Sequence, residues 1–124
     1  MIYSDLAVIW NFKSIPNRGG VYIIWNSINK RFYIGSSWNM RSRFKSHLSC
    51  LIRNKHTNRD FQECFNKHGI KAFEFAVLIQ NDGKETLIAQ EREWMIRYGV
   101  PKNPLSYNRF LAGDYFGRVS NANN

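Results

Sequence analysis

This 124-residue chain has no long hydrophobic run, and its first residues do not resemble a signal peptide. No apolar run reaches the roughly 18 residues that a membrane-spanning helix needs, so we expect no transmembrane segment. The residues from Met1 to Asp5 hold no basic stretch followed by an apolar one, so we also expect no signal peptide and no secretion. A chain of this length suits one domain with a sizeable hydrophobic core.

Cysteine is scarce as well, since the chain has only Cys50 and Cys64. Neither these cysteines nor the three histidines show the tight paired spacing of a structural zinc site. Each cysteine falls on the apolar side of a predicted helix. We therefore expect two buried free thiols in a reducing compartment, and no structural zinc.

Acidic residues are few: 9 Asp and Glu stand against 18 Lys and Arg, which gives a formal net charge of +9. Ten of the basic residues fall between Lys30 and Lys71, where Asp60 and Glu63 are the acidic residues. A basic surface on a small domain is typical of nucleic-acid binding. Positive charge also solubilises proteins or attracts them to acidic lipid, so charge alone does not identify the partner.

The alternation of apolar and polar residues predicts an order of β-β-α-α-β-α. Residues 20–25 and 31–35 are β-prone, and the polar residues 26–30 between them predict a hairpin turn. The third strand is predicted where β-prone side chains recur at every second position, at Phe73, Phe75, Val77 and Ile79. We expect an α+β fold, a small, three-stranded, mainly antiparallel sheet flanked by helices.

Two consecutive helices are predicted after the hairpin. The first begins after its N-cap, Asn39, and runs to about Arg53. The second runs from about Asn58 to His68, and Gly69 stops it. The residues expected to face inward from these two helices are Met40, Phe44, Leu48, Leu51, Ile52, Phe61, Cys64 and Phe65.

The last predicted helix runs from about Lys84 to Tyr98. Glu91 falls on its apolar face, where an ionised carboxylate is costly unless it is paired or binds a metal. Two interpretations stay open for Glu91, a structural partner of Arg43 or a metal ligand, whereas Glu93 points elsewhere and is expected to be solvated. The apolar residues predicted to share this face are Leu87, Ile88, Trp94, Met95 and Tyr98.

Several other residues interrupt the simple folding pattern. Arg43 and His47 lie four positions apart and share a face of the first predicted helix, at the edge of its apolar stripe. Singly, they suit a snorkelling arginine and a half-buried, hydrogen-bonded histidine. Other residues have equally plain explanations when taken alone: core aromatics for Tyr22 and Tyr33, turn residues for Gly20 and Gly35, and a loop cap for Asn108.

Taken together, however, the spacing of these residues resembles the signature of the GIY-YIG nuclease family. Gly20-Val21-Tyr22 is followed by ten residues and then by Tyr33-Ile34-Gly35, with Val21 in place of the signature isoleucine. Arg43 comes ten positions after Tyr33, and Glu91 and Tyr107-Asn108 complete the series. The resemblance is greatest to the nuclease domains of phage and intron-encoded homing endonucleases, in which a histidine equivalent to His56 also occurs.

The resemblance divides the chain into three parts. Residues 19–110 form the predicted GIY-YIG nuclease domain. Residues 1–18 are interpreted as an N-terminal extension, which departs from the homing-endonuclease branch, and residues 6–10 are expected to pack on the domain as a short strand or helical turn. Residues 111–124 are interpreted as a flexible tail or the start of a linker to a DNA-binding region.

The family implies a metal-dependent hydrolysis of DNA phosphodiester bonds that leaves 5′-phosphate and 3′-hydroxyl ends. Glu91 is then the protein ligand of a single divalent cation, Mg²⁺ or Mn²⁺, since these ions prefer oxygen donors. Arg43 is expected to grip the scissile phosphate. Gly20 and Gly35 shape the signature strands, and Asn108 is expected to orient the phosphate or the hydrogen bonds of the site.

The identity of the general base is left open between two residues. Tyr33 is the favoured base or water-positioning group, with Tyr22 hydrogen-bonded nearby, but an unperturbed tyrosine has a pKa near about 10, which Arg43 and the cation would need to lower. His47 is expected to titrate near neutrality, which makes it the competing base or a proton relay.

The implied partner is double-stranded DNA, bound by a monomer with no membrane and no protein partner. The expected location is the cytoplasm of a bacterial or phage-infected cell, or an organelle if the gene is intron-encoded. The alternative is a basic DNA-binding module of the same fold whose catalytic site has decayed. The residues predicted to contact DNA are Lys30, Arg41, Lys45, Arg53, Lys55, His56 and Lys67.

Overall fold

The computed structural model describes residues 15–113 and confirms the predicted order of elements. The expectations for residues 6–10 and for the tail after residue 113 lie outside the described part of the chain. One short 3₁₀ helix, η2, is an addition to the predicted elements. The elements are β1 (Gly20–Asn26), β2 (Phe32–Ser37), α2 (Met40–Ile52), α3 (Arg59–His68), η2 (Ile70–Ala72), β3 (Phe73–Gln80) and α4 (Lys84–Arg97).

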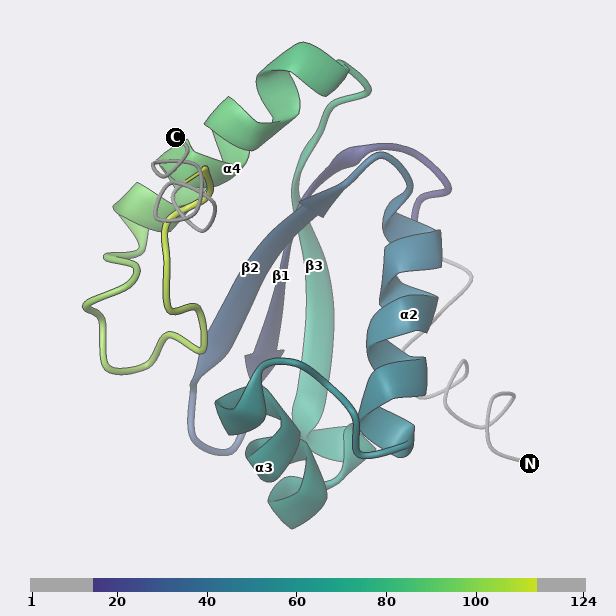
Figure 1. Ribbon diagram of the computed structural model, residues 1–124, viewed down its shortest axis with the longest axis vertical. Helices are drawn as coiled ribbons and strands as arrows, with labels where there is room; N and C mark the ends of the chain where they lie inside the picture. The colour runs from purple at the N-terminus through teal and green to yellow at the C-terminus, as the bar shows by residue number, and fades with distance from the viewer. Residues whose placement is uncertain (1–14, 114–124) are drawn as a thin grey trace, which may run out of the picture.

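The three strands form one antiparallel sheet in the order β2-β1-β3, so β1 is central (Figure 1). The hairpin places Tyr22 opposite Gly35, and Ile24 opposite Tyr33. Successive side chains of β1 point to opposite faces of the sheet, and both faces are covered. This explains why β1 is a continuous β-prone run rather than an alternating one.

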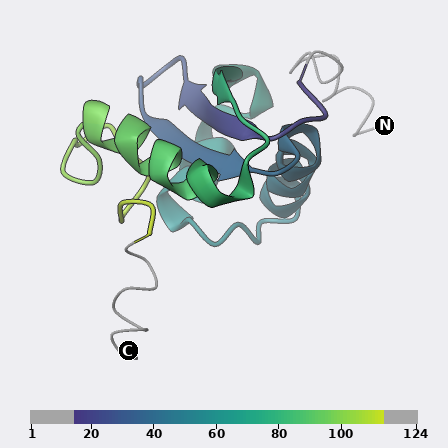
Figure 2. The ribbon, with the colours of Figure 1, turned by 90° about the horizontal axis from the view of Figure 1, so that it is seen from above.

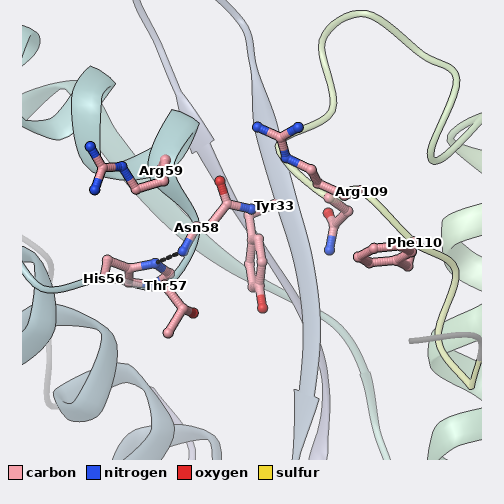
Figure 3. Close-up of a pocket in the computed structure, with 8 residues that line it drawn as sticks. Tyr33, His56, Thr57, Asn58, Arg59, Arg109 and Phe110 are labelled. Atoms are coloured by element: carbon pink, nitrogen blue, oxygen red, sulfur yellow. Dashed lines mark hydrogen bonds between the residues drawn. The ribbon is translucent and has the colours of Figure 1, made fainter. Parts of the chain in front are cut away.

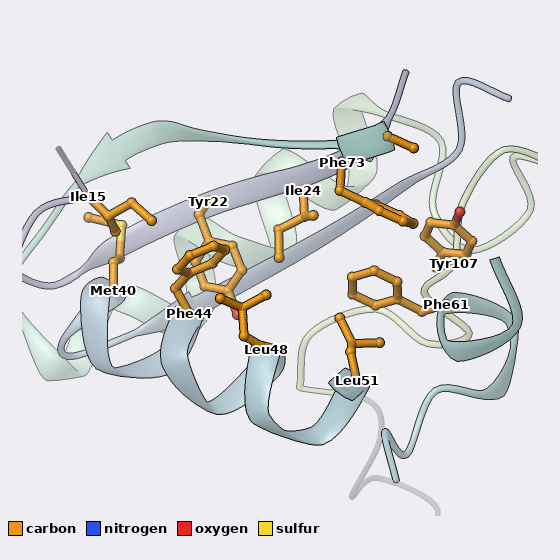
Figure 4. Packing of buried hydrophobic residues seen from close by; sticks show 11 residues of the cluster. Ile15, Tyr22, Ile24, Met40, Phe44, Leu48, Leu51, Phe61, Phe73 and Tyr107 are labelled. Carbon is orange, nitrogen blue, oxygen red and sulfur yellow. The ribbon is translucent and has the colours of Figure 1, made fainter. Parts of the chain in front are cut away.

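Helices cover both faces of the sheet, with α2 and α4 on opposite sides (Figures 1 and 2). On the α2 side, side chains of β1, α2 and α3 form one apolar cluster, which includes Tyr22, Phe44 and Phe61 (Figure 4). On the α4 side, Val21 and Ile34 pack with residues of α4. Within residues 15–113, no helix is both long enough and apolar enough to cross a membrane.

The predicted N-cap at Asn39 and the predicted stop at Gly69 are confirmed, and Asn58 caps α3 in the same way as Asn39 caps α2. The side chain of Asn39 accepts a hydrogen bond from the Ser42 backbone N–H at 3.1 Å, and that of Asn58 accepts one from the Phe61 N–H at 3.1 Å. These bonds satisfy backbone donors that the first turn of a helix leaves without a partner. Gly69 ends α3 with φ at +82°, a conformation that favours glycine.

Two details of the predicted burial are wrong. Ile88 was expected to face inward but is 47% exposed, because the buried stripe of α4 is the single row Leu87, Glu91 and Met95, four residues apart. Cys50 and Cys64 are free thiols, but they are half-buried rather than buried, since they lie at the edges of their helices' apolar stripes.

A segment beyond α4 runs along the outer edge of β2. The backbone N–H of Phe32 donates to the carbonyl of Leu105 at 2.8 Å, and the Tyr107 N–H donates to the carbonyl of Phe32 at 2.7 Å. Further along, Ala112 is fully buried and its carbonyl accepts a hydrogen bond from Arg92 of α4. This C-terminal segment therefore covers the edge strand, whose backbone groups would otherwise be open to pairing with another chain.

Candidate active site

The two signature tyrosines project from the hairpin toward α2 and α3. Tyr22 is 1% exposed and stacks on Phe75, with ring centroids 5.2 Å apart. Tyr33 is half-buried and stacks on Phe61 at 5.6 Å. Neighbouring strands of the hairpin thus bring both phenol rings to the same side of the sheet.

The two signature glycines are required by close packing rather than by turns. An added Cβ at Gly35 would lie 2.5 Å from the hydroxyl oxygen of Tyr22. An added Cβ at Gly20 would lie 2.5 Å from the carbonyl oxygen of Ile79 and 2.7 Å from the Met40 side chain. Both positions lie within strands, so the simple explanation of the glycines as turn residues does not hold.

A row of hydrogen bonds leads from Tyr22 to the start of α3. The Tyr22 hydroxyl lies 2.8 Å from Nε2 of His47, and Nδ1 of His47 lies 2.9 Å from Nε2 of His56. The backbone N–H of Asn58 donates to Nδ1 of His56 at 3.0 Å. The two imidazole rings are stacked, with centroids 5.1 Å apart. Both histidines therefore belong to one network behind Tyr22.

The expectation that His47 titrates near neutrality is wrong. Burial, followed by the neighbouring His56 and Arg43, lowers the pKa of His47 to about 3. Burial also lowers the pKa of His56 to about 4, and the positive charge of Arg43 adds to the effect. His47 is 7% exposed, so the imidazolium form would be poorly solvated. Both rings are neutral at physiological pH.

Arg43 is exposed on α2, and its guanidinium lies beside Tyr22, within hydrogen-bonding reach of the hydroxyl. Partial burial lowers the pKa of Arg43, but Tyr22, Tyr33 and Glu91 together outweigh that effect and raise the pKa above its ordinary value. Burial raises the pKa of both tyrosines, Glu91 raises each pKa further, and Arg43 opposes the change. The four groups therefore interact electrostatically as one site.

Glu91 is 4% exposed in the middle of α4, as its place on the predicted apolar face required. The hydroxyl of Ser36 on β2 donates to Oε1 of Glu91 at 2.5 Å. Ser36 is a site residue that the sequence did not reveal, because a serine following Gly35 in a strand has no distinguishing pattern. It ties the carboxylate of α4 to the strand that carries Tyr33.

These donors suit a single hard cation better than a soft one. Glu91 and the nearby hydroxyl groups offer oxygen atoms, which Mg²⁺ and Mn²⁺ prefer. Within residues 15–113, no three His, Cys, Asp or Glu side chains are grouped closely enough to hold a metal between them. A cation at this site would therefore take one carboxylate from the protein and fill its shell with water and substrate oxygens.

Two adjoining clefts open on Tyr33. One, of about 190 Å³, is also lined by Arg43, His47 and His56. The other, of about 350 Å³, extends past the start of α3 toward Arg109 and Phe110 (Figure 3). Tyr33 thus lies where an extended substrate could reach Arg43 from one side and the basic residues of the second cleft from the other.

Asn108 binds the strand next to Tyr33. Its side-chain oxygen accepts a hydrogen bond from the Ile34 N–H at 2.8 Å, and its amide nitrogen donates to the Ile34 carbonyl at 2.9 Å. The amide therefore fixes the backbone between Tyr33 and Gly35. A direct role toward phosphate stays a prediction.

The residues predicted to contact DNA fall in three places. His56 is only 9% exposed and bonded to His47, so it has little surface to offer DNA. Lys30 lies in the hairpin turn and lines a cleft with Arg97 and Tyr98 on the α4 side. The others are on or near α2 and α3: Arg41, Lys45, Arg53, Lys55 and Lys67. No structural observation tests their binding to DNA.

Comparison with known proteins decides the family. The profile of the GIY-YIG catalytic domain matches residues 18–103, well over half of the chain. The chain belongs to the GIY-YIG family. As a GIY-YIG endonuclease domain, it carries each residue of the predicted series, from Gly20 and Tyr22 to Glu91 and Asn108.

Two curated relatives are named as intron endonucleases. Intron-associated endonuclease 1 of Enterobacteria phage T4 is 31% identical over 80 residues, which are 64% of this chain and 32% of that protein. "Probable intron-encoded endonuclease 1" of Neurospora crassa is 33% identical over 63 residues, 51% of this chain and 19% of that protein. The GIY-YIG chain thus spans a third or less of the length of these relatives.

Solved structures confirm the fold. A mutant of the catalytic domain of intron endonuclease I-TevI matches with a TM-score of 0.69 and 30% identity, over 77% of this chain and 96% of that chain. A second structure, of the catalytic domain of homing endonuclease I-TevI, matches with a TM-score of 0.65 and 29% identity, over 72% and 97% of the two chains. The predicted similarity of this GIY-YIG domain to homing endonucleases is therefore confirmed.

Proposed function

We propose that this GIY-YIG domain is a metal-dependent DNA endonuclease. It hydrolyses phosphodiester bonds in double-stranded DNA to 5′-phosphate and 3′-hydroxyl ends, and it acts as a monomer. The observation that carries the proposal is the meeting of Tyr33, Arg43 and Glu91 from three different elements, β2, α2 and α4, in one electrostatically coupled site. Folding alone does not require a buried carboxylate, an arginine and a phenol to meet there.

Arg43 is the group that binds the scissile phosphate. It stays protonated, and its planar fork matches two phosphate oxygens at once. It lies at a cleft that Tyr33 also lines, so a phosphate bound to Arg43 would lie next to the Tyr33 phenol. In the transition state, the guanidinium would stabilise the added negative charge on the phosphate.

Tyr33 is the group that positions the attacking water. The competing role of His47 is disfavoured because both of its ring nitrogens already have partners, Tyr22 and His56. Burial holds the Tyr33 phenol in its protonated form, and Arg43 is the neighbour that favours its deprotonation. Tyr33 lines both clefts, which gives it access to water and to substrate.

Glu91 would hold the divalent cation, Mg²⁺ or Mn²⁺, with Ser36 keeping the carboxylate in place. When bound, such a cation supplies positive charge that stabilises the phosphate and the leaving 3′-oxygen. A Glu91 carboxylate held within α4 is ready for this task without reorganisation.

The basic residues on and near α2 and α3 support DNA as the substrate. Residues such as Lys45 and Lys55 are exposed on the same side of the sheet as Arg43. Contacts of this kind position a duplex through its phosphates and carry no sequence information. Sequence preference of a longer homing endonuclease would then need residues outside this module.

The decisive experiment is nicking of supercoiled plasmid in Mg²⁺ or Mn²⁺ by the full 124-residue chain. Glu91→Gln and Arg43→Ala should abolish cleavage while the protein remains folded. Glu93→Gln, on the exposed side of the same helix, and Arg97→Ala serve as matched controls that should cut like the native chain. Binding without cleavage by the native chain would favour the decayed module, and full cutting by Glu91→Gln would contradict the proposed metal site.

A further inference from the structure

The larger cleft beside Tyr33 has an arginine on each of its two walls. Arg59, the first residue of α3, is exposed and lines one wall. Arg109, on the segment beyond α4, is exposed and lines the other wall. Figure 3 shows the two arginines on either side of Tyr33. Two guanidinium groups at one cleft favour an anion there, and phosphate matches their hydrogen-bonding geometry.

The two walls of this cleft are joined by hydrogen bonds. The side-chain amide of Asn58 donates to the carbonyl of Tyr107 at 2.7 Å. The guanidinium of Arg109 donates to the carboxylate of Asp60 at 3.1 Å. Both bonds connect the start of α3 to the C-terminal segment. The cleft therefore exists before any ligand binds, which reduces the entropy that binding would cost.

Asp60 does not cancel the positive charge of the cleft. The same carboxylate oxygen that contacts Arg109 also lies 3.4 Å from the guanidinium of Arg31, which is stacked on the ring of Tyr107. One carboxylate is thus shared between two arginines, and Arg59 adds a third positive charge at the cleft. The net charge of this region is positive, as a phosphate-binding site requires.

The clefts form a row that suits a chain of phosphates better than one small anion. The two clefts beside Tyr33 share that residue, and the larger one joins a third cleft, of about 410 Å³, at Asn108 and Arg109. Basic residues line this row in the order Arg43, Arg59, Arg109 and Lys102. A DNA strand carries a phosphate at every nucleotide, so its backbone can contact successive members of such a row.

We propose that Arg59 and Arg109 bind the phosphate that adjoins the scissile phosphate on the cleaved DNA strand. The inference rests on the proposed nuclease function, in which Arg43 holds the scissile phosphate in the smaller cleft next to Tyr33. The neighbouring phosphate would then lie across Tyr33, in the larger cleft. Because this phosphate does not react, the two arginines contribute equally to substrate and transition state and increase affinity rather than the rate of the bound complex.

The binding test compares two variants that lose the same charge. Arg59→Ala/Arg109→Ala removes both cleft arginines, and the control Lys71→Ala/Arg97→Ala removes two exposed basic residues that line neither cleft beside Tyr33. Fluorescence anisotropy follows binding to a short labelled duplex in metal-free buffer at several salt concentrations, and circular dichroism checks the fold.

The cleft variant should bind DNA about tenfold more weakly than the native chain, the effect of losing charge-assisted hydrogen bonds. The slope of log affinity against log salt concentration should become shallower by about 0.9, which corresponds to one phosphate contact. The control should keep the native slope and lose at most about threefold in affinity. Equal losses in the two variants, or native binding by the cleft variant, would overturn the proposal.

The position of the bound phosphate is tested after the cleavage sites have been mapped on the same duplex. A single uncharged methylphosphonate then replaces the phosphate on one or the other side of the mapped bond. One of the two replacements should weaken binding by the native chain about tenfold and should have no effect on Arg59→Ala/Arg109→Ala. Equal effects on the two proteins would contradict the assignment of this phosphate to the two arginines.

Single-turnover cleavage at saturating protein supplies the remaining test. The cleft variant should cut within about threefold of the native rate, because it loses binding that is equal in substrate and transition state. A loss of tenfold or more at saturation would instead show that Arg59 and Arg109 act on the scissile phosphate itself, contrary to the proposal. If the native chain cuts no DNA, the nuclease function fails, while the metal-free binding experiment still decides whether these arginines bind a DNA phosphate.

Discussion

Gly35 lies directly across the hairpin from Tyr22, and the Tyr22 hydroxyl occupies the space that a side chain at position 35 would need. The distance from an added Cβ to the hydroxyl oxygen, 2.5 Å, is far below a normal contact. This hydroxyl is the one that His47 holds at 2.8 Å. The second signature glycine therefore determines the position of the first signature tyrosine.

Gly35→Ala should consequently impair cleavage more than folding. The added methyl must displace the Tyr22 ring and break its bond to His47, while the surrounding apolar cluster can absorb part of the strain. We expect the free energy of unfolding to fall by about 1–3 kcal/mol, a typical cost of overpacking. Cleavage should fall by at least about tenfold, the worth of one displaced hydrogen bond. Urea unfolding and plasmid nicking measure the two effects, and native cleavage by a folded Gly35→Ala protein would refute this prediction.

The neutral histidine pair should make the protein sensitive to mild acid. The folded pKa values, about 3 for His47 and about 4 for His56, lie below the ordinary value of about 6.5, so the unfolded chain binds protons first as the pH falls. The stabilisation is therefore complete above pH 6.5 and is lost progressively down to pH 4 and below. Between pH 7 and 5 we expect a loss of about 2 kcal/mol from His47, and less from the more accessible His56.

Chemical denaturation at a series of pH values measures this slope. In His56→Gln, the dependence on pH between 7 and 5 should become shallower, because one buried imidazole no longer titrates. A native protein whose stability is flat over this range would show that the histidines keep their ordinary pKa values in the fold, contrary to the burial of both rings.

Replacement of Arg43 by lysine should show whether cleavage needs only the positive charge of this residue or also its planar shape. Arg43→Lys keeps a positive charge but loses the planar fork that can contact two phosphate oxygens and Tyr22. We expect Arg43→Lys to retain DNA binding but to cleave on the order of 100-fold more slowly, which corresponds to about 3 kcal/mol of transition-state stabilisation. Single-turnover rates at saturating protein distinguish binding from cleavage, and a lysine variant with native rate would show that charge alone suffices.

Asn108 should matter mainly for stability. Asn108→Ala removes both hydrogen bonds to Ile34 and leaves a buried N–H and a buried carbonyl without these partners. The expected loss is about 2–4 kcal/mol in the free energy of unfolding. Arg109→Ala, at the neighbouring exposed position, breaks a surface ion pair with Asp60 and should cost less than about 1 kcal/mol. Equal stabilities of the two variants would contradict the role assigned to Asn108.

The sequence could predict the elements of the fold better than their arrangement. The strands and helices follow from local patterns, such as the N-cap at Asn39 and the stop at Gly69, and the structure places them within a few residues of the expected bounds. The central place of β1 and its pairing with β3 depend on contacts between residues some 50 positions apart, for which no local signal exists. Ile88 is likewise exposed because α4 contacts the sheet along a single narrow row of residues, which local patterns do not reveal.

The residues of the candidate site were also only partly predictable from the sequence. Spacing along the chain was enough to single out Tyr22, Tyr33, Arg43 and Glu91. It could not show that His56 lies behind His47, because only the turn between α2 and α3 brings the rings together. The pKa of His47 was misjudged for that reason, since burial and a second imidazole are tertiary effects. Ser36 was missed because its importance comes entirely from Glu91, a residue of a distant helix.

The family profile ends at residue 103, but the hydrogen-bonded covering of β2 continues from Leu105 to Asn108, and within the described residues 15–113 Ala112 is the last one that is buried. The shortest segment of this nuclease that could be transferred intact to another protein is therefore longer than the region that defines its family. If the domain were cut at the end of the profile and fused to a foreign DNA-binding protein, the outer edge of β2, the strand that bears Tyr33, would be uncovered. That edge could then pair with a neighbouring molecule. Fusions joined after Ala112 would keep that strand edge covered and would place the junction outside the cleavage site.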